Sequence, residues 1–515
     1  MYCRILLLCL VTAAKCTPLL TDGQVLIDAA TNERVRLQCV NWYGAHQEPM
    51  VPGGLESTST DAIVDLILSQ IGANCVRIPL SDKTVLQNPI VDPAFAPAYP
   101  NATALEVLDA VIHSLTSKGL MVILNSHTTQ PGWIGLNEAP QGLWHGLGLR
   151  TADWAQALAT LAARYAHIPL VVGFDLRNEI HDQNGVTITW GESNDAESDW
   201  LAAATLADRA ITYANPDALI IVSGLCRSYD LRRMVQRPGP EAALYRRKLV
   251  YTTHVYTFSW WWTYMDPYPV PETALTLFLS ALIALAVAVR CRDIAHYDAL
   301  TQYDNEDTES KPAPKKSVRV SCPTIDSQII QALAGAFTPF ACLWIAIACV
   351  KANTANSNGC YTIATESEPW IIAGVVLLVP SLMALVLCCI TKGHGHMLLI
   401  GFLFWTCIAC LAVCILCCIT PTYWMVQEEL RRWCLDGRTI PVWVGEFGAA
   451  VGSDSSSWRH LTRILQDNDL DFAYWALNGR TWSKGEWHTE AFGLLDDSYT
   501  KIRNQSFTDR IFRFP

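Results

Sequence analysis

Charged residues are scarce in this sequence of 515 residues, since only 17% are charged while 51% are hydrophobic. Soluble proteins have about 25% charged residues, so the apolar excess must be concentrated somewhere. The sequence has no low-complexity tract, which excludes disordered, collagenous and coiled-coil proteins. Its formal net charge of -11 argues against a nucleic acid as a partner. We therefore expect a folded soluble body with a membrane part attached.

Metal-ligand spacing is absent among the 19 cysteines. The two C-x-x-C pairs, Cys407 with Cys410 and Cys414 with Cys417, lie in an apolar run where small residues pack helices together. We therefore predict no metal and no other cofactor. Five further cysteines fall in segments that we expect to be exported, where disulfides form, but the sequence does not reveal their pairing: Cys39, Cys75, Cys226, Cys360 and Cys434.

Long apolar runs occur in two places only. The first, Met1 to Ala14, is too short to span a bilayer and predicts a signal peptide over residues 1–16. The second place holds four runs of the length that a membrane helix needs, about 20 residues: Thr273–Arg290, Ile329–Val350, Trp370–Ile390 and Met397–Ile419. We therefore predict that residues 273–419 form a four-span transmembrane insertion, with the lipid bilayer as a partner.

The loops between these runs predict the orientation. Lysine and arginine gather in the loop 291–328, so this loop should be cytosolic by the positive-inside rule. The flanking segments 17–272 and 420–515 should then both be extracellular or lumenal. Each contains one glycosylation sequon, at Asn101 and at Asn504. The sequence thus predicts a multi-pass membrane glycoprotein.

The two flanking segments show apolar strand-like runs that alternate with amphipathic helices, a rhythm typical of parallel α/β folds. The predicted strands number eight: 36–41, 74–79, 120–125, 171–177, 219–223, 249–254, 441–446 and 472–476. Eight such units in about 350 residues predict a (β/α)8 TIM barrel. The barrel would be formed by residues 17–272 and 420–515, with the apolar block inserted after strand six.

Polar and aromatic side chains cluster at the carboxyl ends of these strands, which is the catalytic face of such barrels. A single arginine or histidine there is more often a packing residue. Two carboxylates, Glu179 after strand four and Glu446 on strand seven, are typical of the acid and nucleophile of a glycosidase. The other candidates are Arg77, His127, Asn178, His254, Tyr256 and Trp475.

Four motifs resemble glycoside hydrolase family five, the cellulase-type retaining β-glycosidases with a (β/α)8 fold: Asn41–Gly44, Asn74–Pro79, Gly173–Asp182 and Pro441–Gly448. The resemblance is closest to bacterial endo-β-1,4-glucanases and covers both flanking segments. Two positions depart from the family pattern. Ile180 replaces the usual proline, and Asn125-Ser126 precedes His127 where an acidic or basic residue is common.

The resemblance implies a role for each candidate. Glu179 would be the general acid/base, Glu446 the nucleophile, and Arg77 would hydrogen-bond Glu446 and keep it ionised. Asn178 would bind the 2-hydroxyl of the sugar. The remaining residues would line the cleavage subsite, with Tyr256 touching the nucleophile and Trp475 stacking under the sugar: His127, His254, Tyr256 and Trp475.

Three functions remain open at this point. The first is a membrane-anchored endo-β-1,4-glucanase that hydrolyses β-glucan or another β-glycoside. The second is a β-glycosidase of the endoglycoceramidase or glucosylceramidase type that acts on membrane glycolipids. The third is a non-catalytic carbohydrate receptor. The aromatic run Phe258–Tyr264 fits an interfacial belt or a sugar-stacking platform equally well.

Overall fold

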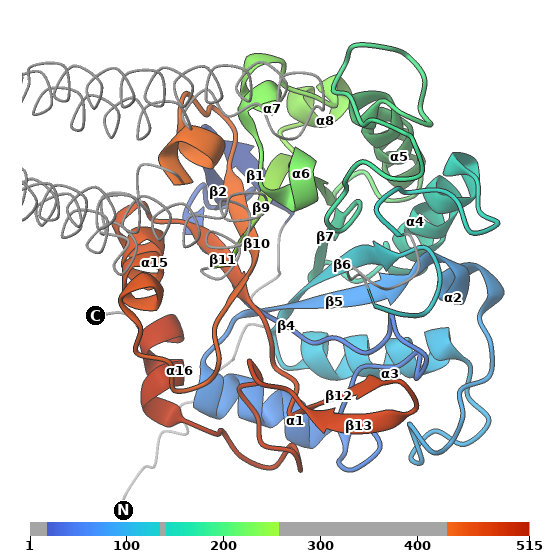
Figure 1. Cartoon of the computed structure of the whole chain (residues 1–515), viewed down its shortest axis with the longest axis vertical. Helices are drawn as coiled ribbons and strands as arrows, with labels where there is room; N and C mark the ends of the chain where they lie inside the picture. Colours follow the sequence, from blue (N-terminus) through green and yellow to red (C-terminus); the bar gives the residue numbers. More distant parts are fainter. Residues whose placement is uncertain (1–17, 134–140, 257–429, 514–515) are drawn as a thin grey trace, which may run out of the picture. The chain divides into compact units, whose positions relative to one another are not determined.

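The structure, a computed structural model, describes residues 18–133, 141–256 and 430–513 (Figure 1). These residues belong to one compact unit that is assembled from the sequence segments 1–257 and 420–515. The predicted signal peptide, the aromatic run 258–264 and the four apolar runs of 273–419 lie outside the described residues.

The centre of the unit is a closed barrel of parallel strands in which neighbours in space follow the chain order. The ring closes where the last strand pairs with the first. The predicted (β/α)8 barrel is therefore confirmed, and every predicted strand overlaps one of its members. The strands are β4 (Gln38–Asn41), β5 (Cys75–Ser81), β6 (Met121–Thr128), β7 (Val171–Asp175), β8 (Leu219–Ser223), β9 (Leu249–Tyr256), β10 (Val442–Gly448) and β11 (Asp471–Tyr474).

Strands β9 and β10 join the two sequence segments. They pair in parallel, with Tyr251 opposite Val442 and His254 opposite Glu446. The polypeptide thus leaves the barrel after Tyr256 and returns to the neighbouring position in the same sheet.

The helices lie outside the ring of strands (Figure 1). Helix α3 begins with a capping box between Thr103 and Glu106, and its apolar face is buried. The larger helices are α1 (Thr60–Leu66) with its π-helical extension η1 (Ile67–Ile71), α3 (Ala104–Ser117), α4 (Thr151–Tyr165), α5 (Trp200–Ala214) and α15 (Ser456–Asp467). The remaining ones are α2 (Asp82–Gln87), α6 (Leu225–Ser228), α7 (Arg232–Gln236), α8 (Glu241–Tyr245), η2 (Arg431–Leu435) and α16 (Gln505–Phe512).

Two small antiparallel sheets were not predicted. The first covers the amino ends of the barrel strands, because its residues Leu19 and Leu26 pack with Cys39, Cys75 and Trp443 in one core. The second is a hairpin that follows the last barrel strand and lies on the opposite, carboxyl side. The strands are β1 (Leu19–Asp22), β2 (Val25–Asp28), β3 (Arg34–Val35), β12 (Arg480–Ser483) and β13 (Glu486–Thr489).

One prediction is corrected. Within 18–133, 141–256 and 430–513, no helix is long and apolar enough to cross a membrane. The longest, α4 and α5, have 15 residues each, which is about 22 Å of helix against a hydrocarbon core of about 30 Å. This finding contradicts the predicted multi-pass membrane localisation, and the described residues do not support the bilayer as a partner.

A disulfide joins the first two barrel strands. It links Cys39 of β4 to Cys75 of β5, which lie opposite each other in the sheet register and are both buried. The sequence separation of the two cysteines is 36 residues. The sequence left this pairing open, because neighbouring strands bring together residues that are distant along the chain.

We expect that Cys39→Ala lowers the free energy of unfolding by about 2–4 kcal/mol, because the link restricts the unfolded chain. Urea denaturation under oxidising conditions measures this. The variant Cys75→Ala and the double variant should lose as much stability as the single variant, since each removes the same bond. Stability equal to that of the wild type in all three would contradict the assignment.

Candidate active site

A fully buried arginine organises the carboxyl end of the barrel. From β5, Arg77 Nη1 donates to Glu446 Oε1 at 2.7 Å and to Asn41 Oδ1 at 2.9 Å. Its Nε and Nη2 donate to Asp175 Oδ2 at 2.9 and 2.8 Å, and Nη2 also donates to Asn178 Oδ1 at 2.9 Å. The four acceptors belong to β4, β7, β10 and the turn after β7. One guanidinium therefore holds three other strands in fixed positions.

Asp175 and Asn41 are parts of this network that were not among the predicted site residues. Burial raises the pKa of Asp175, and the charge of Arg77 opposes this effect. Asn41 also donates through Nδ2 to the carbonyl oxygen of Gly445, directly before Glu446. Both residues lie inside the motifs that carry the family resemblance, so the signal for them was present in the sequence.

Glu446 receives hydrogen bonds on both carboxylate oxygens. Arg77 donates to Oε1, and the Tyr256 hydroxyl at the end of β9 donates to Oε2 at 2.9 Å. Burial and the charge of Glu446 raise the pKa of Tyr256, so the hydroxyl remains a donor. The two donors thus fix the orientation of the Glu446 carboxyl group.

Glu179 lies in a contrasting environment. Its backbone has a left-handed φ of 43°, and its N–H donates to Ser228 Oγ at 3.2 Å. Burial raises the pKa of its carboxyl group, and the nearby Arg227 guanidinium opposes the rise. A carboxyl group that keeps its proton to higher pH is suited to donating that proton. The two glutamates are thus differentiated by their surroundings.

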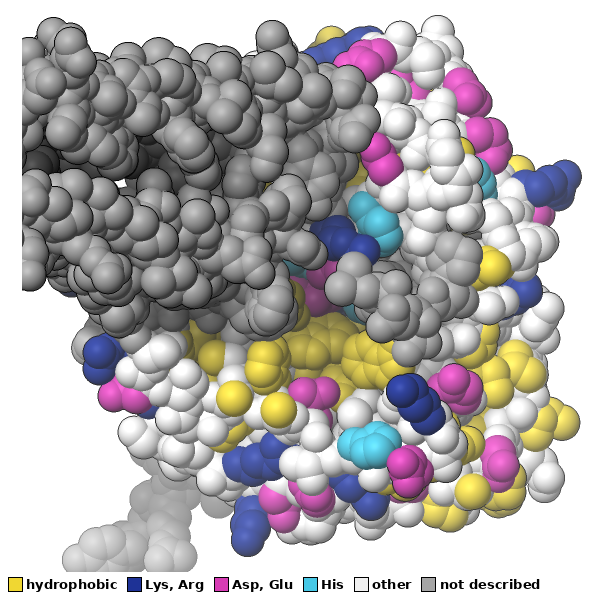
Figure 2. Space-filling model, viewed as in Figure 1, with side chains coloured by type: hydrophobic (Ala, Val, Ile, Leu, Met, Phe, Trp, Pro, Cys, Tyr) yellow, Lys and Arg dark blue, Asp and Glu magenta, His cyan; other side chains and the backbone are white. Residues whose placement is uncertain are grey.

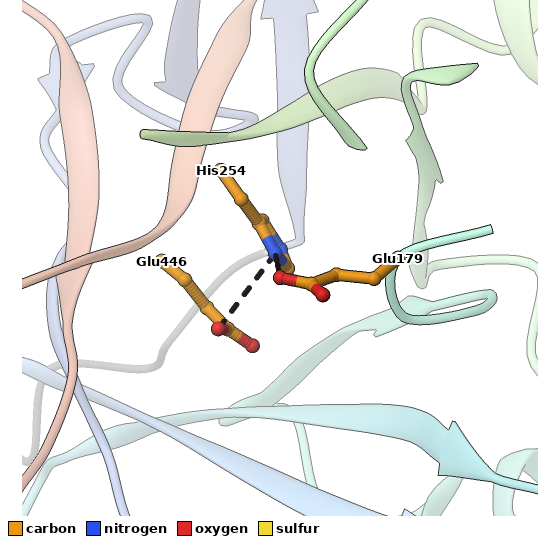
Figure 3. Close-up of side chains that lie close together, drawn as sticks. All are labelled: Glu179, His254 and Glu446. Carbon is orange, nitrogen blue, oxygen red and sulfur yellow. Dashed lines mark hydrogen bonds and ion pairs between the residues drawn. The ribbon is translucent and has the colours of Figure 1, made fainter. Parts of the chain in front are cut away.

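His254 of β9 lies between the two carboxyl groups (Figure 3). Its Nδ1 is 3.0 Å from Glu179 Oε1 and 3.7 Å from Glu446 Oε2. Burial lowers the pKa of this histidine to about 4, so the ring is neutral near pH 7. The neutral His254 ring thus contacts both carboxyl groups and adds no positive charge beside either of them.

The same three residues offer ligand atoms within 4.8 Å of one another, a spacing that a metal ion could bridge. However, the Glu446 carboxylate is already paired with Arg77 and accepts from Tyr256. A cation would have to compete with this buried guanidinium. We therefore interpret the three residues as a part of the Arg77 network rather than as metal ligands.

An aromatic wall borders these groups. Trp475 follows β11 and stacks in parallel on Tyr43, with ring centroids 4.9 Å apart. The ring of His127 stacks on Trp475 at 5.7 Å, and Trp133 meets Tyr43 edge to face at 5.4 Å. His46 lies behind these rings and is the fifth residue of the wall. Burial lowers the pKa of its ring to about 3. The wall therefore combines two residues that the sequence predicted, His127 and Trp475, with three that it did not.

The two departures from the family pattern are accommodated locally. Ile180 is fully buried. Ser126, which precedes His127, donates to Asp82 Oδ1 at 2.7 Å, and Arg177 from the turn after β7 pairs with Asp82 at 2.9 Å. A buried arginine therefore neutralises Asp82, although the residue before His127 is uncharged.

The structure thus brings six of the predicted residues into one connected network, with His127 and Trp475 packed beside it. The network consists of Arg77, Asn178, Glu179, His254, Tyr256 and Glu446. It places two carboxyl groups with different hydrogen-bond partners opposite each other, beside an aromatic surface.

We expect that Asp175→Asn lowers the free energy of unfolding by about 3–5 kcal/mol, because the buried Arg77 loses a charged partner. Urea denaturation measures the loss. Asp22→Asn is the matched control, because its pair with Arg247 lies on the surface and should matter little. Equal effects of the two substitutions would contradict the central role of the Arg77 network.

Comparisons with known proteins agree with this geometry. The family model for cellulase (glycosyl hydrolase family 5) matches residues 36–274. A glycosyl hydrolase 5 family protein from Chamaecyparis obtusa is 31% identical over 277 residues, which are 50% of this chain and 47% of the relative. An endoglucanase from Paenibacillus polymyxa is 31% identical over 208 residues, covering 40% of this chain and 49% of the relative. The chain thus spans about half the length of these curated relatives.

A solved structure gives the same fold. The catalytic domain of the major endoglucanase from Xanthomonas campestris pv. campestris superimposes with a TM-score of 0.54 at 17% sequence identity, covering 96% of this chain and 99% of that one. At this identity the likeness concerns the fold. Together with the family model and the relatives, it confirms the resemblance that the four motifs indicated. The barrel of this chain is thus similar to glycosyl hydrolase family 5, the cellulase family, which supports a glycoside hydrolase.

Proposed function

We propose that this protein hydrolyses β-1,4 bonds within β-glucans by a retaining double displacement. The observation that carries the proposal is the approach of Glu179 and Glu446, whose facing oxygens lie within 4.8 Å. Retaining glycosidases have carboxyl groups about 5–5.5 Å apart, whereas inverting enzymes need about 6.5–9.5 Å to admit a water molecule. The short separation favours direct attack by one of the two carboxylates.

In the first step, Glu446 attacks the anomeric carbon while Glu179 donates its proton to the leaving oxygen. The anomeric C–O bond breaks as the bond to Glu446 forms, giving a glycosyl-enzyme. The assignment follows the environments: Glu446 accepts from Arg77 and Tyr256, whereas burial raises the pKa of Glu179. The donors of Glu446 also receive the carboxylate when it departs in the second step.

In the second step, Glu179 removes a proton from water, and the water oxygen attacks the anomeric carbon and releases Glu446. Asn178 is positioned for the 2-hydroxyl, because Arg77 binds its oxygen and leaves the amide nitrogen to donate. Trp475 offers a ring face on which the apolar face of a sugar can stack. The pyranose would lie between this ring and the two glutamates.

A chain of sugars is favoured by aromatic residues beyond the wall. Trp133 Nε1 donates to the carbonyl oxygen of Trp482 in β12 at 3.3 Å. Trp482 in turn contacts Trp487 of β13 and Phe95, with ring centroids 5.2 and 5.0 Å apart. All three of these rings are partly exposed. Figure 2 shows hydrophobic side chains gathered on this face, beside the acidic, basic and histidine side chains at its centre.

A pocket adjoins the same hairpin and adds polar groups. Gln47, Arg480, Trp487 and Phe95 line it. The amide nitrogen of Gln47 is buried and has no hydrogen-bond partner in the part of the chain that the structure describes. Its partly exposed aromatic rings offer faces on which a sugar ring can stack. These features extend from the carboxyl groups over several rings, which supports a glucan chain more than a single sugar on a lipid.

We expect Glu446→Gln to abolish hydrolysis of carboxymethylcellulose, and Glu179→Gln to lower kcat by about 10²–10⁴-fold, the usual contribution of a general acid. With 2,4-dinitrophenyl β-cellobioside the leaving group needs no proton. The first step should therefore survive in Glu179→Gln, visible as a burst of dinitrophenolate, but not in Glu446→Gln.

The exposed Glu33→Gln is the matched control and should hydrolyse normally. Proton NMR should show that the first product formed has the β configuration. Release of the α-anomer would contradict the retaining mechanism. Activity on glucosylceramide but on no β-glucan would replace the proposed substrate class with glycolipids. Wild-type turnover by Glu446→Gln would contradict Glu446 as the nucleophile. Binding of sugars without hydrolysis by the wild-type protein would indicate a non-catalytic carbohydrate receptor.

We also expect the hairpin to act on long substrates. Trp482→Ala and Trp487→Ala should raise KM for cellohexaose by about tenfold, since stacking on one aromatic ring contributes about 1–2 kcal/mol. KM for 2,4-dinitrophenyl β-cellobioside should stay unchanged. Steady-state kinetics on both substrates measure this, and the exposed Tyr213→Ala serves as a control. Equal losses on both substrates would contradict a remote sugar-binding role.

A further inference from the structure

The loop that follows β8 is folded tightly around the backbone of Glu179. Its residues Cys226, Arg227 and Ser228 all have left-handed backbones, with φ values of 53°, 59° and 63°. Such conformations cost free energy for residues other than glycine, so surrounding contacts must hold them. Arg227 N–H donates to the carbonyl oxygen of Ile180 at 2.8 Å, and Glu179 N–H donates to Ser228 Oγ at 3.2 Å. The two bonds fasten the loop on both sides of Glu179.

The side chain of Arg227 makes two further contacts with this region. Its Nη1 lies 3.8 Å from Glu179 Oε2. Its Nη2 donates to Nε2 of His181 at 3.1 Å. Arginine can only donate, so Nε2 of His181 must be the unprotonated nitrogen and Nδ1 must carry the hydrogen. That Nδ1 donates to the carbonyl oxygen of Glu179 at 2.7 Å. A closed circuit therefore links Arg227, His181 and Glu179.

Packing holds the histidine in this circuit. The backbone N–H of His181 donates to the carbonyl oxygen of Gly142 at 3.0 Å. A Cβ atom at position 142 would lie 2.6 Å from the His181 ring, so glycine leaves the space that the ring occupies. Burial and the charge of Arg227 lower the pKa of His181, which keeps the ring neutral and able to accept.

We propose that Arg227, anchored by His181, is a positioning residue that orients the Glu179 carboxyl group and sets the pH range in which Glu179 can donate its proton. The inference rests on the proposed function, because it concerns the residue assigned there as the acid. It adds a group outside the network of Arg77, from a loop that the sequence motifs do not include.

The groups that face Glu179 come from several elements. His254 from β9 is neutral, and Arg77 from β5 is bound to its four acceptors. Glu446 and Tyr256 face Glu179 from β10 and β9, and the neutral His181 follows it in the same turn. Arg227 is the cation paired with Glu179 among the described residues. A cation stabilises the carboxylate and so lowers the pKa of Glu179.

The test is the pH dependence of kcat/KM for Arg227→Gln. The alkaline limb reports loss of the proton from the acid in the free enzyme. Without the cation this proton is held more tightly, so the limb should move to higher pH, by about half a unit to one unit because the pair is partly exposed. Arg227→Lys keeps the charge and should leave the limb nearer its original position. Arg233→Gln removes a similarly exposed arginine that pairs with Glu192 instead, and should not move the limb.

A second measurement does not depend on hydrolysis. Carbon-13 NMR of protein labelled at the glutamate carboxyl carbon follows the titration of Glu179 directly, with Glu179→Gln identifying its signal. The Glu179 midpoint should rise in Arg227→Gln. If the midpoint and the alkaline limb both coincide with those of the wild type, the proposal is wrong. If the wild type cleaves no β-glycoside but the midpoint rises, the proposed function fails while the action of Arg227 on Glu179 stands.

Discussion

The buried ion pair between Arg77 and Asp175 is the constraint on which the carboxyl end of the barrel depends. A guanidinium without exposure to water is costly unless every donor finds an acceptor. Here the acceptors come from three other strands and one turn, so satisfying one charge fixes the relative positions of Asn41, Asn178 and Glu446. The positions of the site residues therefore follow from the hydrogen bonds that the buried Arg77 guanidinium requires.

Much of the barrel could be predicted because parallel strands that are covered by helices leave a strong apolar signal of regular spacing. The strands at the amino end and the hairpin could not, because runs of two to four residues such as Arg34–Val35 carry no periodicity. The disulfide was missed for a related reason: pairing requires the register between strands, and neither Cys39 nor Cys75 encodes that register locally.

The candidate site followed the same division. Residues at strand ends were predictable because the fold sends all carboxyl ends to one face. Residues of the connecting loops were not, since their positions depend on backbone conformations that the sequence does not announce. The usual signal for a left-handed backbone is glycine or asparagine. Neither occurs in the segment Cys226–Ser228. Only the contacts of the folded chain explain why Arg227 reaches Glu179.

The pairing of β9 with β10 has a consequence for how the chain acquires its reactive groups. The continuous stretch from β4 to β9 contains Arg77, Glu179 and His254, but Glu446 comes only with the second segment. A nascent or truncated chain that ends before β10 would carry a proton donor without a partner. Contacts between segments so distant in sequence carry a large loop-closure cost and form slowly. Glu179 and Glu446 therefore face each other only after the barrel has closed. Any reaction that needs both carboxyl groups then shows that the barrel is completely folded.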